Sequence, residues 1–456
     1  MNLHAKASIG GASLLIAGAL VLVPVLPASA ASSTLTVCAS PAATYTTIQS
    51  AVDAATDGDT IDVCAGVFDD SVTITKNITL RGAQHGIDAR SGRTNPAAET
   101  VISGANTPMR YSGAGVTSGT VDGFTLQTTS DHASVIGAVE ANADGYTWTN
   151  NIVDAHNGYG FNFRSTGAAP TTINHNRFTK AGGDEGAVAV TSVPDGETVG
   201  DVHIVDNAFV ANGVGINIIG PGLTDGLTIT GNTATDGGNF LVSAATGGPT
   251  LVSNNTITNA GASAIFLSGN NDGMTIRGNI ITGGAATGVR LSSDVVGTTK
   301  NVVIDGNTIV NRGYGIRITS ASATGLSITG NNISGSSSNG IRIEAAGSIT
   351  GSGNTITGTA SGFAPCLDDT ASKVCPALQT FAAPPASGGG SSGDGTTSAV
   401  DPAAPASTHG AAAVAGSAPG ALAETGFEGA PVAVLGALVA ILGAALVLTG
   451  RRRARA

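Results

Sequence analysis

The chain has 456 residues, of which 41% are hydrophobic, 11% charged and 4% aromatic, a composition that allows one large domain with a substantial core plus appendages. The formal net charge is −11. Without the two terminal segments described below, 15 basic and 30 acidic side chains remain, and this acidity argues against nucleic acid or anionic lipid as partners.

The first 30 residues are predicted to be a secretory signal peptide. Lys6 stands in a short polar start, residues 9–23 are mostly apolar, and residues 28–30 are small, as a signal peptidase requires. A transmembrane anchor is the alternative. It is disfavoured because the apolar run is short and ends in Pro24 and Pro27.

Residues 46–55 are predicted to form the only helix of the mature protein. Thr46 and Gln49 fit a capping box. One apolar stripe follows from the helical period and contains Ile48, Ala51, Val52 and Ala55. We expect this helix to lie across the first coil of the fold and to shield it from water and from edge-to-edge pairing.

Residues 57–82 carry the first strand and turn signals. Asp57, Asp59 and Asp62 are interpreted as turn formers and solvent-facing strand residues, with a calcium site as the alternative. From Gly82 to Ser118 the strand pattern fails, and residues 84–99 are predicted to form a long loop between coils. Long insertions on one face of a repeat protein commonly carry function.

From about residue 120 the chain repeats a short pattern. Residues 274–281 read MTIRGNII, residues 302–309 read VVIDGNTI, and residues 326–333 read LSITGNNI. One asparagine recurs at intervals of 23 to 31 residues: Asn151, Asn176, Asn207, Asn232, Asn255, Asn279, Asn307, Asn331 and Asn354. A period in this range is typical of a solenoid.

Each unit contains short alternating runs of Ile, Val and Thr and no helical period. A unit of this kind cannot bury its own apolar face, but stacked copies can form continuous columns of Ile inside. Stacked asparagines can then hydrogen-bond from coil to coil at a turn. The sequence therefore predicts an all-β parallel β-helix, right-handed by default, with about ten coils over residues 120–369.

The G-N-x-I turn followed by G-[IV]-x-[IL] resembles the repeats of the pectate-lyase-like superfamily of right-handed parallel β-helices. The resemblance covers roughly residues 45–370, and residues 55–61 resemble the turn that leads into the first coils of that superfamily. It implies a β-helix domain over residues 31–381, with coils at about 60–370. It leaves the activity open, because one fold hosts many chemistries.

Four cysteines agree with export to an oxidising compartment, where an even number favours disulfides. We predict the pairs Cys38–Cys64 and Cys366–Cys375, because each pair lies at one end of the stack and would fix a cap to its neighbouring coil. A metal site is the rival interpretation, but no histidine lies near either pair in sequence.

Residues 382–421 are rich in Ala, Gly, Ser, Pro and Thr and are predicted to be a flexible linker. The pentapeptide Leu422, Ala423, Glu424, Thr425, Gly426 follows, then an apolar run at 432–449 and an arginine-rich tail. This order resembles the cell-wall sorting signal of Gram-positive surface proteins, in the L-A-x-T-G form seen in actinobacteria.

The resemblance implies cleavage by a sortase between Thr425 and Gly426 and attachment of Thr425 to peptidoglycan. An apolar run of this length can span a bilayer, and the arginines would hold the C-terminus in the cytoplasm. The expected location is the outer cell wall, reached through a membrane-spanning precursor. A plain C-terminal membrane anchor is the alternative.

Catalytic candidates are few. The signatures of polygalacturonases, pectin methylesterases, alginate epimerases and pectate lyases are missing. The acidic and histidine residues that remain fall on neighbouring coils, where turn positions could bring them together: Asp131, His132, Asp154, His156, His175, Asp184 and Glu185. Solvated turn formers are the plainer interpretation of these residues.

Three arginines follow the turns of successive late coils. Alternation along each strand predicts that Arg290, Arg317 and Arg342 point outward in one column. Either acids such as Glu344 neutralise them, or the column binds a linear polyanion such as a uronate polymer or wall phosphate. Only 17 aromatic residues occur, and several fall at core positions, which disfavours aromatic stacking on neutral sugars.

Two functions follow from these features. The first is a non-catalytic, wall-anchored β-helix that displays a rigid surface for adhesion or polysaccharide binding, without metal or other cofactor. The second is a wall-anchored lyase, hydrolase or epimerase that acts on acidic glycans through unfamiliar motifs. The missing motifs favour the first, so the sequence predicts a protein that is not an enzyme.

Overall fold

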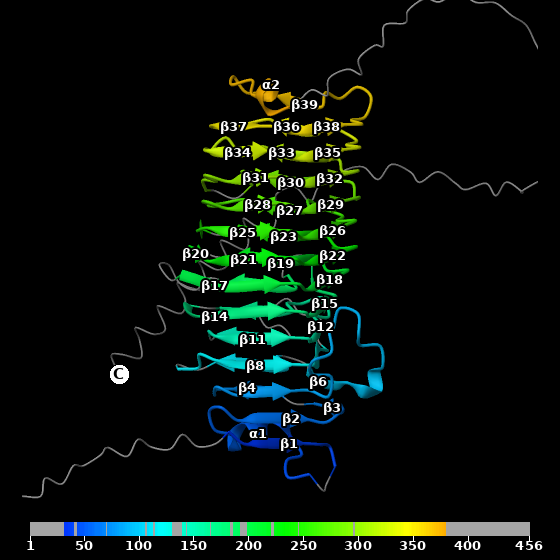
Figure 1. Cartoon of the computed structure of the whole chain (residues 1–456), viewed down its shortest axis with the longest axis vertical. Helices are drawn as coiled ribbons and strands as arrows, with labels where there is room; N and C mark the ends of the chain where they lie inside the picture. Colours follow the sequence, from blue (N-terminus) through cyan, green and yellow to red (C-terminus); the bar gives the residue numbers. More distant parts are fainter. Residues whose placement is uncertain are drawn as a thin grey trace, which may run out of the picture.

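The computed structural model describes residues 32–40, 43–69, 71–104, 107–112, 115–129, 139–142, 144–164, 166–182, 186–191, 198–219, 223–244, 246–294 and 297–379. The predicted signal peptide, linker and sorting signal lie outside these residues. The described chain winds into a tall parallel β-helix, in which each coil adds one strand to each of three long sheets (Figure 1). The predicted all-β solenoid is confirmed.

Every strand pairs in parallel with its counterparts in the coils before and after it. Sheet A contains β1 (Thr34–Val37), β2 (Thr60–Val63), β5 (Thr79–Arg81), β8 (Gly119–Asp122), β11 (Tyr146–Thr149), β14 (Thr166–Asn174), β17 (Thr198–Val205), β21 (Leu227–Thr230), β25 (Thr250–Ser253), β28 (Thr275–Arg277), β31 (Val303–Asp305), β34 (Leu326–Thr329) and β37 (Ile349–Ser352). Two short strands, β20 (Leu223–Asp225) and β24 (Thr246–Gly247), extend this sheet beside β17.

The other two sheets have 12 strands each. Sheet B contains β3 (Gly66–Phe68), β6 (Thr100–Gly104), β9 (Phe124–Thr128), β12 (Ile152–Asp154), β15 (Arg177–Thr179), β18 (Ala208–Val210), β22 (Thr233–Thr235), β26 (Thr256–Thr258), β29 (Ile280–Thr282), β32 (Thr308–Val310), β35 (Asn332–Ser334) and β38 (Thr355–Thr357). Sheet C contains β4 (Val72–Ile74), β7 (Met109–Ser112), β10 (Val139–Asn142), β13 (Phe161–Phe163), β16 (Val188–Thr191), β19 (Val214–Ile219), β23 (Asn239–Ser243), β27 (Ile265–Leu267), β30 (Thr287–Leu291), β33 (Tyr314–Ile318), β36 (Ile341–Ile343) and β39 (Cys366–Asp368).

Alternation along the strands places one column of aliphatic side chains inside each sheet. Ile276, Ile304 and Ile328 are partners in the register of sheet A and are at most 1% exposed. β-Branched side chains suit these strands because they pack well on a pleated surface. All six isoleucines predicted to lie inside are buried: Ile276, Ile281, Ile304, Ile309, Ile328 and Ile333.

The N-terminal half fills the same interior with aromatic rings. Phe161, Phe178 and Phe209 follow one another with ring centroids 5.1–5.2 Å apart, and Phe163 is also fully buried. The prediction that several aromatic residues fall at core positions is confirmed. Because these rings are buried in the core, they cannot contact a ligand on the surface.

The recurring asparagines form a buried ladder at the corner between sheets A and B. The side-chain oxygen of each accepts hydrogen bonds from the side-chain and backbone N–H groups of the asparagine one coil earlier, with side-chain distances of 2.8–3.1 Å. Asn151 also accepts from the backbone N–H of Phe124, where the ladder begins. The predicted coil-to-coil hydrogen bonding is confirmed, and it satisfies amides that burial would otherwise leave unpaired.

The N-terminal cap differs in detail from the prediction. The helix α1 runs over Ile48–Ala54, and its N-cap is Thr47, whose hydroxyl accepts from the backbone N–H of Ser50. The predicted capping box of Thr46 and Gln49 is therefore wrong. The Gln49 side chain instead donates to the backbone carbonyl of Thr73 in β4 and accepts from its backbone N–H. These two hydrogen bonds connect the helix to sheet C. The predicted apolar stripe is buried.

The three aspartates near this cap have separate structural partners. Asp57 accepts from Asn77, and Asp62 forms an ion pair with Arg81 at 2.6 Å. Asp59 accepts from the backbone N–H groups of Thr56 and Ser33 at 2.7 and 2.6 Å. These bonds, with those from the two hydroxyl groups, hold the pKa of Asp59 well below its ordinary value.

Acid should therefore weaken the N-terminal cap. A carboxyl group with a lowered pKa in the folded state stabilises that state above its unfolded pKa of about 3.9, and this contribution is lost as the pH falls below that value. We expect Asp59→Asn to lower the melting temperature by several degrees at neutral pH and to lessen its fall between about pH 5 and pH 3. Thermal unfolding over that range checks this, and parallel pH curves for the variant and the wild type would contradict it.

One disulfide lies at each end of the stack, as predicted. Cys38 pairs with Cys64, and Cys366 in β39 pairs with Cys375. Cys375 begins a second short helix, α2 (Cys375–Leu378), so the prediction of a single helix is wrong. Leu378 is buried, and its carbonyl accepts from Asn354, which closes the asparagine ladder. No helix among the described residues is long and apolar enough to span a membrane.

Candidate functional site

Two polar columns run side by side on the outer face of sheet C, near the C-terminal end of the stack. Arg290, Arg317 and Arg342 are register partners on β30, β33 and β36. Two positions further along each strand, the chain carries Ser292, Thr319 and Glu344, and Asp369 follows β39. Backbone hydrogen bonds from each of these residues to the coil before it continue the strand register. We call this surface the sheet C strip.

Each arginine of the strip contacts a carboxylate. Arg317 donates to Glu344 at 3.0 Å, and Arg342 lies 3.4 Å from the same carboxylate and 2.5 Å from Asp369. Arg290 lies 3.4 Å from Asp294. The three arginine side chains are 20–24% exposed, while the acidic side chains are 31–47% exposed, so the acids are the more accessible partners.

Glu344 is the centre of this network. Burial alone would raise its pKa, but hydrogen bonds and charges from Arg317 and then Arg342 outweigh burial and hold the pKa below its ordinary value. At neutral pH Glu344 is therefore ionised. It can accept a proton from a ligand, and it is unsuited to donate one.

Aromatic rings contact two of the three arginines. The Arg290 guanidinium lies 5.4 Å from the centre of the Phe266 ring, which is its register partner on β27. The Arg317 guanidinium lies 5.0 Å from the ring of Tyr314. Such cation–π contacts hold a guanidinium in place. The preceding coils carry Asn162, Ala189, Asn217 and Val242 at the equivalent positions, so the three consecutive arginines belong to the last coils.

Among the histidine and acid candidates that the structure describes, His175 lies apart from Asp154 and His156. Asp154 lies at the end of β12, where it accepts from the backbone of His156 and pairs with Lys180 at 2.5 Å. His175 lies at the other corner, between β14 and β15, near Asp88 of the long insertion. The remaining candidates, Asp131, His132, Asp184 and Glu185, lie outside the described residues.

The insertion between β5 and β6 packs on the corner between sheets A and B. Arg93 and Glu99 are buried and form an ion pair, and Arg93 also donates to the carbonyl of Asn150, two coils away. The hydroxyl of Thr125 donates to Glu99 at 2.8 Å. These contacts fix the insertion as a structural brace, and they leave its buried charges fully engaged.

Asp368 also has a structural role, although it neighbours Asp369 in sequence. It is buried and accepts from the backbone N–H groups of Thr370 and Val374, so it holds the loop that leads to α2. No group of three or more His, Cys, Asp or Glu side chains within the described ranges is placed to hold a metal ion. Of Asp368 and Asp369, only Asp369 belongs to the sheet C strip.

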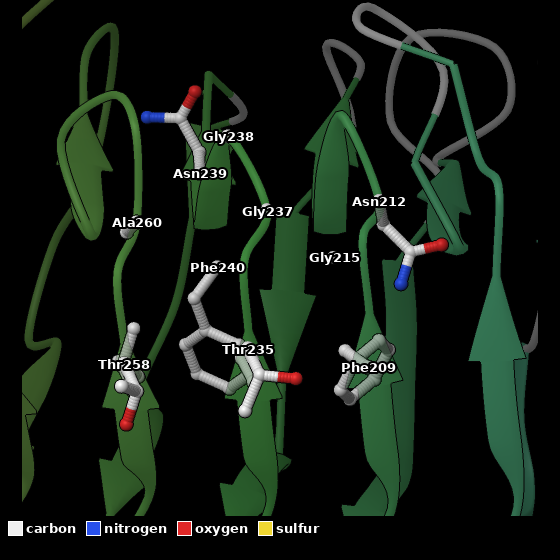
Figure 2. A pocket seen from close by; sticks show the side chains of 12 residues that line it. Phe209, Asn212, Gly215, Thr235, Gly237, Gly238, Asn239, Phe240, Thr258 and Ala260 are labelled. Atoms are coloured by element: carbon white, nitrogen blue, oxygen red, sulfur yellow. The ribbon is translucent and has the colours of Figure 1, made fainter. Parts of the chain in front are cut away.

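A small pocket lies in earlier coils than the sheet C strip. It is lined by Phe209 and Phe240, whose ring centroids lie 5.8 Å apart, and by Asn212 and Asn239 at the corner between sheets B and C (Figure 2). Its volume of about 10 Å³ is close to the least that one water molecule needs. A substrate cannot enter it, so the sheet C strip is the better candidate site.

Sequence reasoning found part of the strip and missed the rest. The alternation of Gly-Ile-Arg-Ile named the three arginines and Glu344, whereas Asp294 was not singled out because it lies in a loop without strand period. Asp369 lies beside a second aspartate at the end of the stack, beyond the last strand that the period predicts. Only the register, which aligns Ile343 with Asp368, places Asp369 beside Glu344.

Comparison with known proteins agrees with this architecture. Residues 197–356 match the family model described as right-handed β-helix region. The right-handed winding that is the default for parallel crossovers agrees with this match. No curated protein sequence matches the chain.

Solved structures give the same fold at low identity. The catalytic domain of a GH87 α-1,3-glucanase in complex with tetrasaccharides is 14% identical, with a TM-score of 0.54 over 76% of this chain and 67% of that chain. The catalytic unit of a thermostable GH87 α-1,3-glucanase from Streptomyces thermodiastaticus is 16% identical, with a TM-score of 0.46 over 69% of this chain. This chain spans 62% of the length of that glucanase unit.

A third similar structure is the A-module of the Azotobacter vinelandii mannuronan C-5 epimerase AlgE6, 21% identical, with a TM-score of 0.43 over 69% of this chain and 94% of that chain. All three are enzymes that act on polysaccharides. The prediction that this protein is not an enzyme is contradicted by these comparisons. Its support was the absence of familiar motifs, and that absence carries little weight at 14% identity to the glucanase domain of the same fold.

Proposed function

We propose that the protein is an enzyme that processes an acidic polysaccharide, a linear uronate polymer, along the sheet C strip. The observation that carries this proposal is the in-register column of Arg290, Arg317 and Arg342 beside Glu344 and Asp369. The fold that the chain shares with polysaccharide enzymes supports the proposal at the level of architecture.

The repeat of the coils suits a polymer with one negative charge per sugar. Successive coils lie about 4.7–4.9 Å apart, which is close to the length of one sugar residue in an extended chain. The column thus offers one guanidinium for each sugar carboxylate. A guanidinium has five N–H donors, so an arginine that already contacts a protein carboxylate can also bind a carboxylate of the ligand.

Glu344 is suited to be the proton acceptor. In a uronate, the carbon next to the carboxylate carries the acidic proton, and arginines on that carboxylate stabilise the negative charge that develops when the proton leaves. Binding of the ligand adds negative charge beside Glu344 and engages Arg317 and Arg342. Both effects raise the pKa of Glu344 and make it a better base than in the free protein.

Proton abstraction leads to two outcomes that differ in the second step. The electron pair can expel the neighbouring glycosidic oxygen, which takes up a proton and leaves an unsaturated uronate, as in a lyase. Alternatively, the carbon regains a proton on the opposite face, as in an epimerase. Hydrolysis fits less well, because it requires a carboxylic acid that stays protonated, and Glu344 is ionised.

Incubation of the full-length protein with uronate polymers tests the proposal. Polygalacturonate, polymannuronate and polyguluronate would be supplied separately, with an α-1,3-glucan as the neutral comparison. We expect at least one uronate polymer to yield unsaturated ends or to exchange its acidic proton with deuterated solvent, both read by NMR. If none of the three polymers shows unsaturated ends or proton exchange, the proposal is overturned.

We also propose that a sortase attaches the protein to peptidoglycan through Thr425. This part rests on the sequence alone, on the pentapeptide at 422–426, the apolar run at 432–449 and the arginine-rich tail. Display on the wall would place the β-helix, beyond a long linker, where extracellular polysaccharides reach it.

Deletion of residues 422–426 should release the protein from the wall. We expect the deletion variant in the membrane fraction or the medium, and the wild type only after the wall is digested with a muramidase. Immunoblots of the separated fractions provide the measurement. A deletion variant that still requires muramidase for release would contradict the sortase proposal.

A further inference from the structure

A shallow groove lies on the outer face of sheet A, at the level of β21, β25 and β28, which are stacked in succession in Figure 1. Its volume is about 210 Å³. Thr228, Leu251 and Thr275 line it from successive strands, and Gly226, Pro249 and Gly273 line it from the turns that precede those strands. None of these residues is charged.

Backbone geometry keeps the groove open. Gly226 and Gly273 both have positive φ, 67° and 72°, where the chain turns into the sheet. A side chain is strained at such an angle, so glycine is favoured and adds no bulk. Leu251 is 39% exposed, which is high for a leucine in this fold, and its side chain forms an apolar floor together with Pro249.

An ionisable pair borders the groove one coil earlier. Asp201 and His203 lie two residues apart on β17, and the Nε2 atom of His203 is 3.0 Å from the carboxylate of Asp201. His203 is the register partner of Thr228. A Cβ atom placed on Gly226 would lie 3.3 Å from the backbone nitrogen of Asp201. The pair therefore continues the lining of the groove toward the N-terminal end of the stack.

This arrangement combines features that a sugar ring needs. An apolar floor can contact the C–H face of the ring, and threonine hydroxyls, an imidazole and a carboxylate at the rim can bond its hydroxyl groups. Because Nε2 contacts Asp201, Nδ1 is the imidazole nitrogen that a ligand could bond. The lining itself carries no positive charge, so it offers nothing to a uronate carboxylate.

We propose that this groove and the Asp201–His203 pair form a binding site for a neutral sugar residue, separate from the sheet C strip. The volume is below the range of about 300–1,000 Å³ that encloses larger ligands, so the site takes one ring of a longer chain. No aromatic residue is among the described residues that line the groove, and we expect a weak dissociation constant, on the order of 1 mM.

The site would serve to hold a glycan against sheet A while a different polymer occupies sheet C. The two surfaces differ in charge and belong to different sheets of the same coils. A negative result for the uronate proposal would therefore not count against this site. A negative result for this site would not count against the uronate proposal.

Ligand-observed NMR with the full-length protein tests this site. Cellotetraose, maltotetraose, laminaritetraose and mannotetraose serve as probes, each titrated separately. We expect at least one to bind, with Leu251→Asp and His203→Gln each weakening that binding by about tenfold or more. Ile280→Asp is the matched control, because Ile280 is an aliphatic residue on the outer face of sheet B and is 47% exposed. It should bind like the wild type.

Two results would overturn the proposal: binding of none of the four probes by the wild type, or equal binding by the wild type and Leu251→Asp. The melting temperature of each variant shows whether lost binding reflects lost folding. Turnover of uronate polymers should be the same in Leu251→Asp as in the wild type, which separates this site from the sheet C strip.

Discussion

Replacement of Ile304 by Asp should lower the free energy of unfolding by at least about 4 kcal/mol. Ile304 lies inside sheet A between Ile276 and Ile328 and is 1% exposed. An ionised carboxylate there would have no partner, and a protonated one would still lose the packing of the isoleucine side chain. Denaturant unfolding followed by circular dichroism measures the change.

Val303→Asp is the matched control for this prediction. Val303 precedes Ile304 on β31 but points outward and is half-buried, so its carboxylate would reach water. We expect a loss below about 1 kcal/mol, mainly from weaker strand propensity. Equal stability of Ile304→Asp and the wild type would show that the register of this coil is wrong.

Replacement of Glu344 by Gln should lower kcat on the uronate substrate by at least about 100-fold. The amide keeps the size of the side chain and an oxygen that can accept from Arg317, but it cannot take up a proton at neutral pH. Binding should change much less than turnover. Steady-state kinetics of both proteins, with kcat and KM determined separately, provide the measurement.

The pH dependence of the wild type gives an independent check of Glu344. A base must be ionised to act, so kcat/KM should fall as the pH drops through the pKa of Glu344 in the free enzyme. Arg317 and Arg342 hold that pKa below its ordinary value of about 4.3, so activity should persist in mild acid. Unchanged kcat in Glu344→Gln would remove Glu344 from the reaction.

The fold was predictable because each coil repeats the same physical solution. Alternation fixes which face of a strand is buried, and the asparagine interval fixes the length of a coil, so Ile304 and Asn307 could be placed from sequence. Local choices at the cap were less certain. Thr46 and Thr47 are adjacent and chemically alike, and the tertiary contact of Gln49 with Thr73 removed the partner that a capping box would need.

The candidate site was only partly predictable for the same reason. Arg317 and Arg342 follow the strand period, which sets their direction and their column. Asp154 and His175 sit at turns, where sequence spacing does not say which corner of the coil a residue occupies. The sequence did not single out Asp201 and His203 as candidate site residues, because the groove beside them is formed by residues one coil later.

The most direct test of the central claim compares two triple variants. In one, Arg290, Arg317 and Arg342 are replaced by Ala. In the other, three arginines on the outer faces of sheets A and B are replaced by Ala, so that the net charge changes equally: Arg81, Arg177 and Arg277. The measurement is the affinity for polygalacturonate and polymannuronate, and turnover of each, at low and at high salt.

We expect the sheet C variant to lose binding by at least about tenfold and to lose turnover, while the control variant stays close to the wild type. Wild-type binding should weaken as salt rises, because the arginines of the strip are partly exposed and their charges are screened. Equal affinity and turnover of the wild type and the sheet C variant on both polymers would contradict the account.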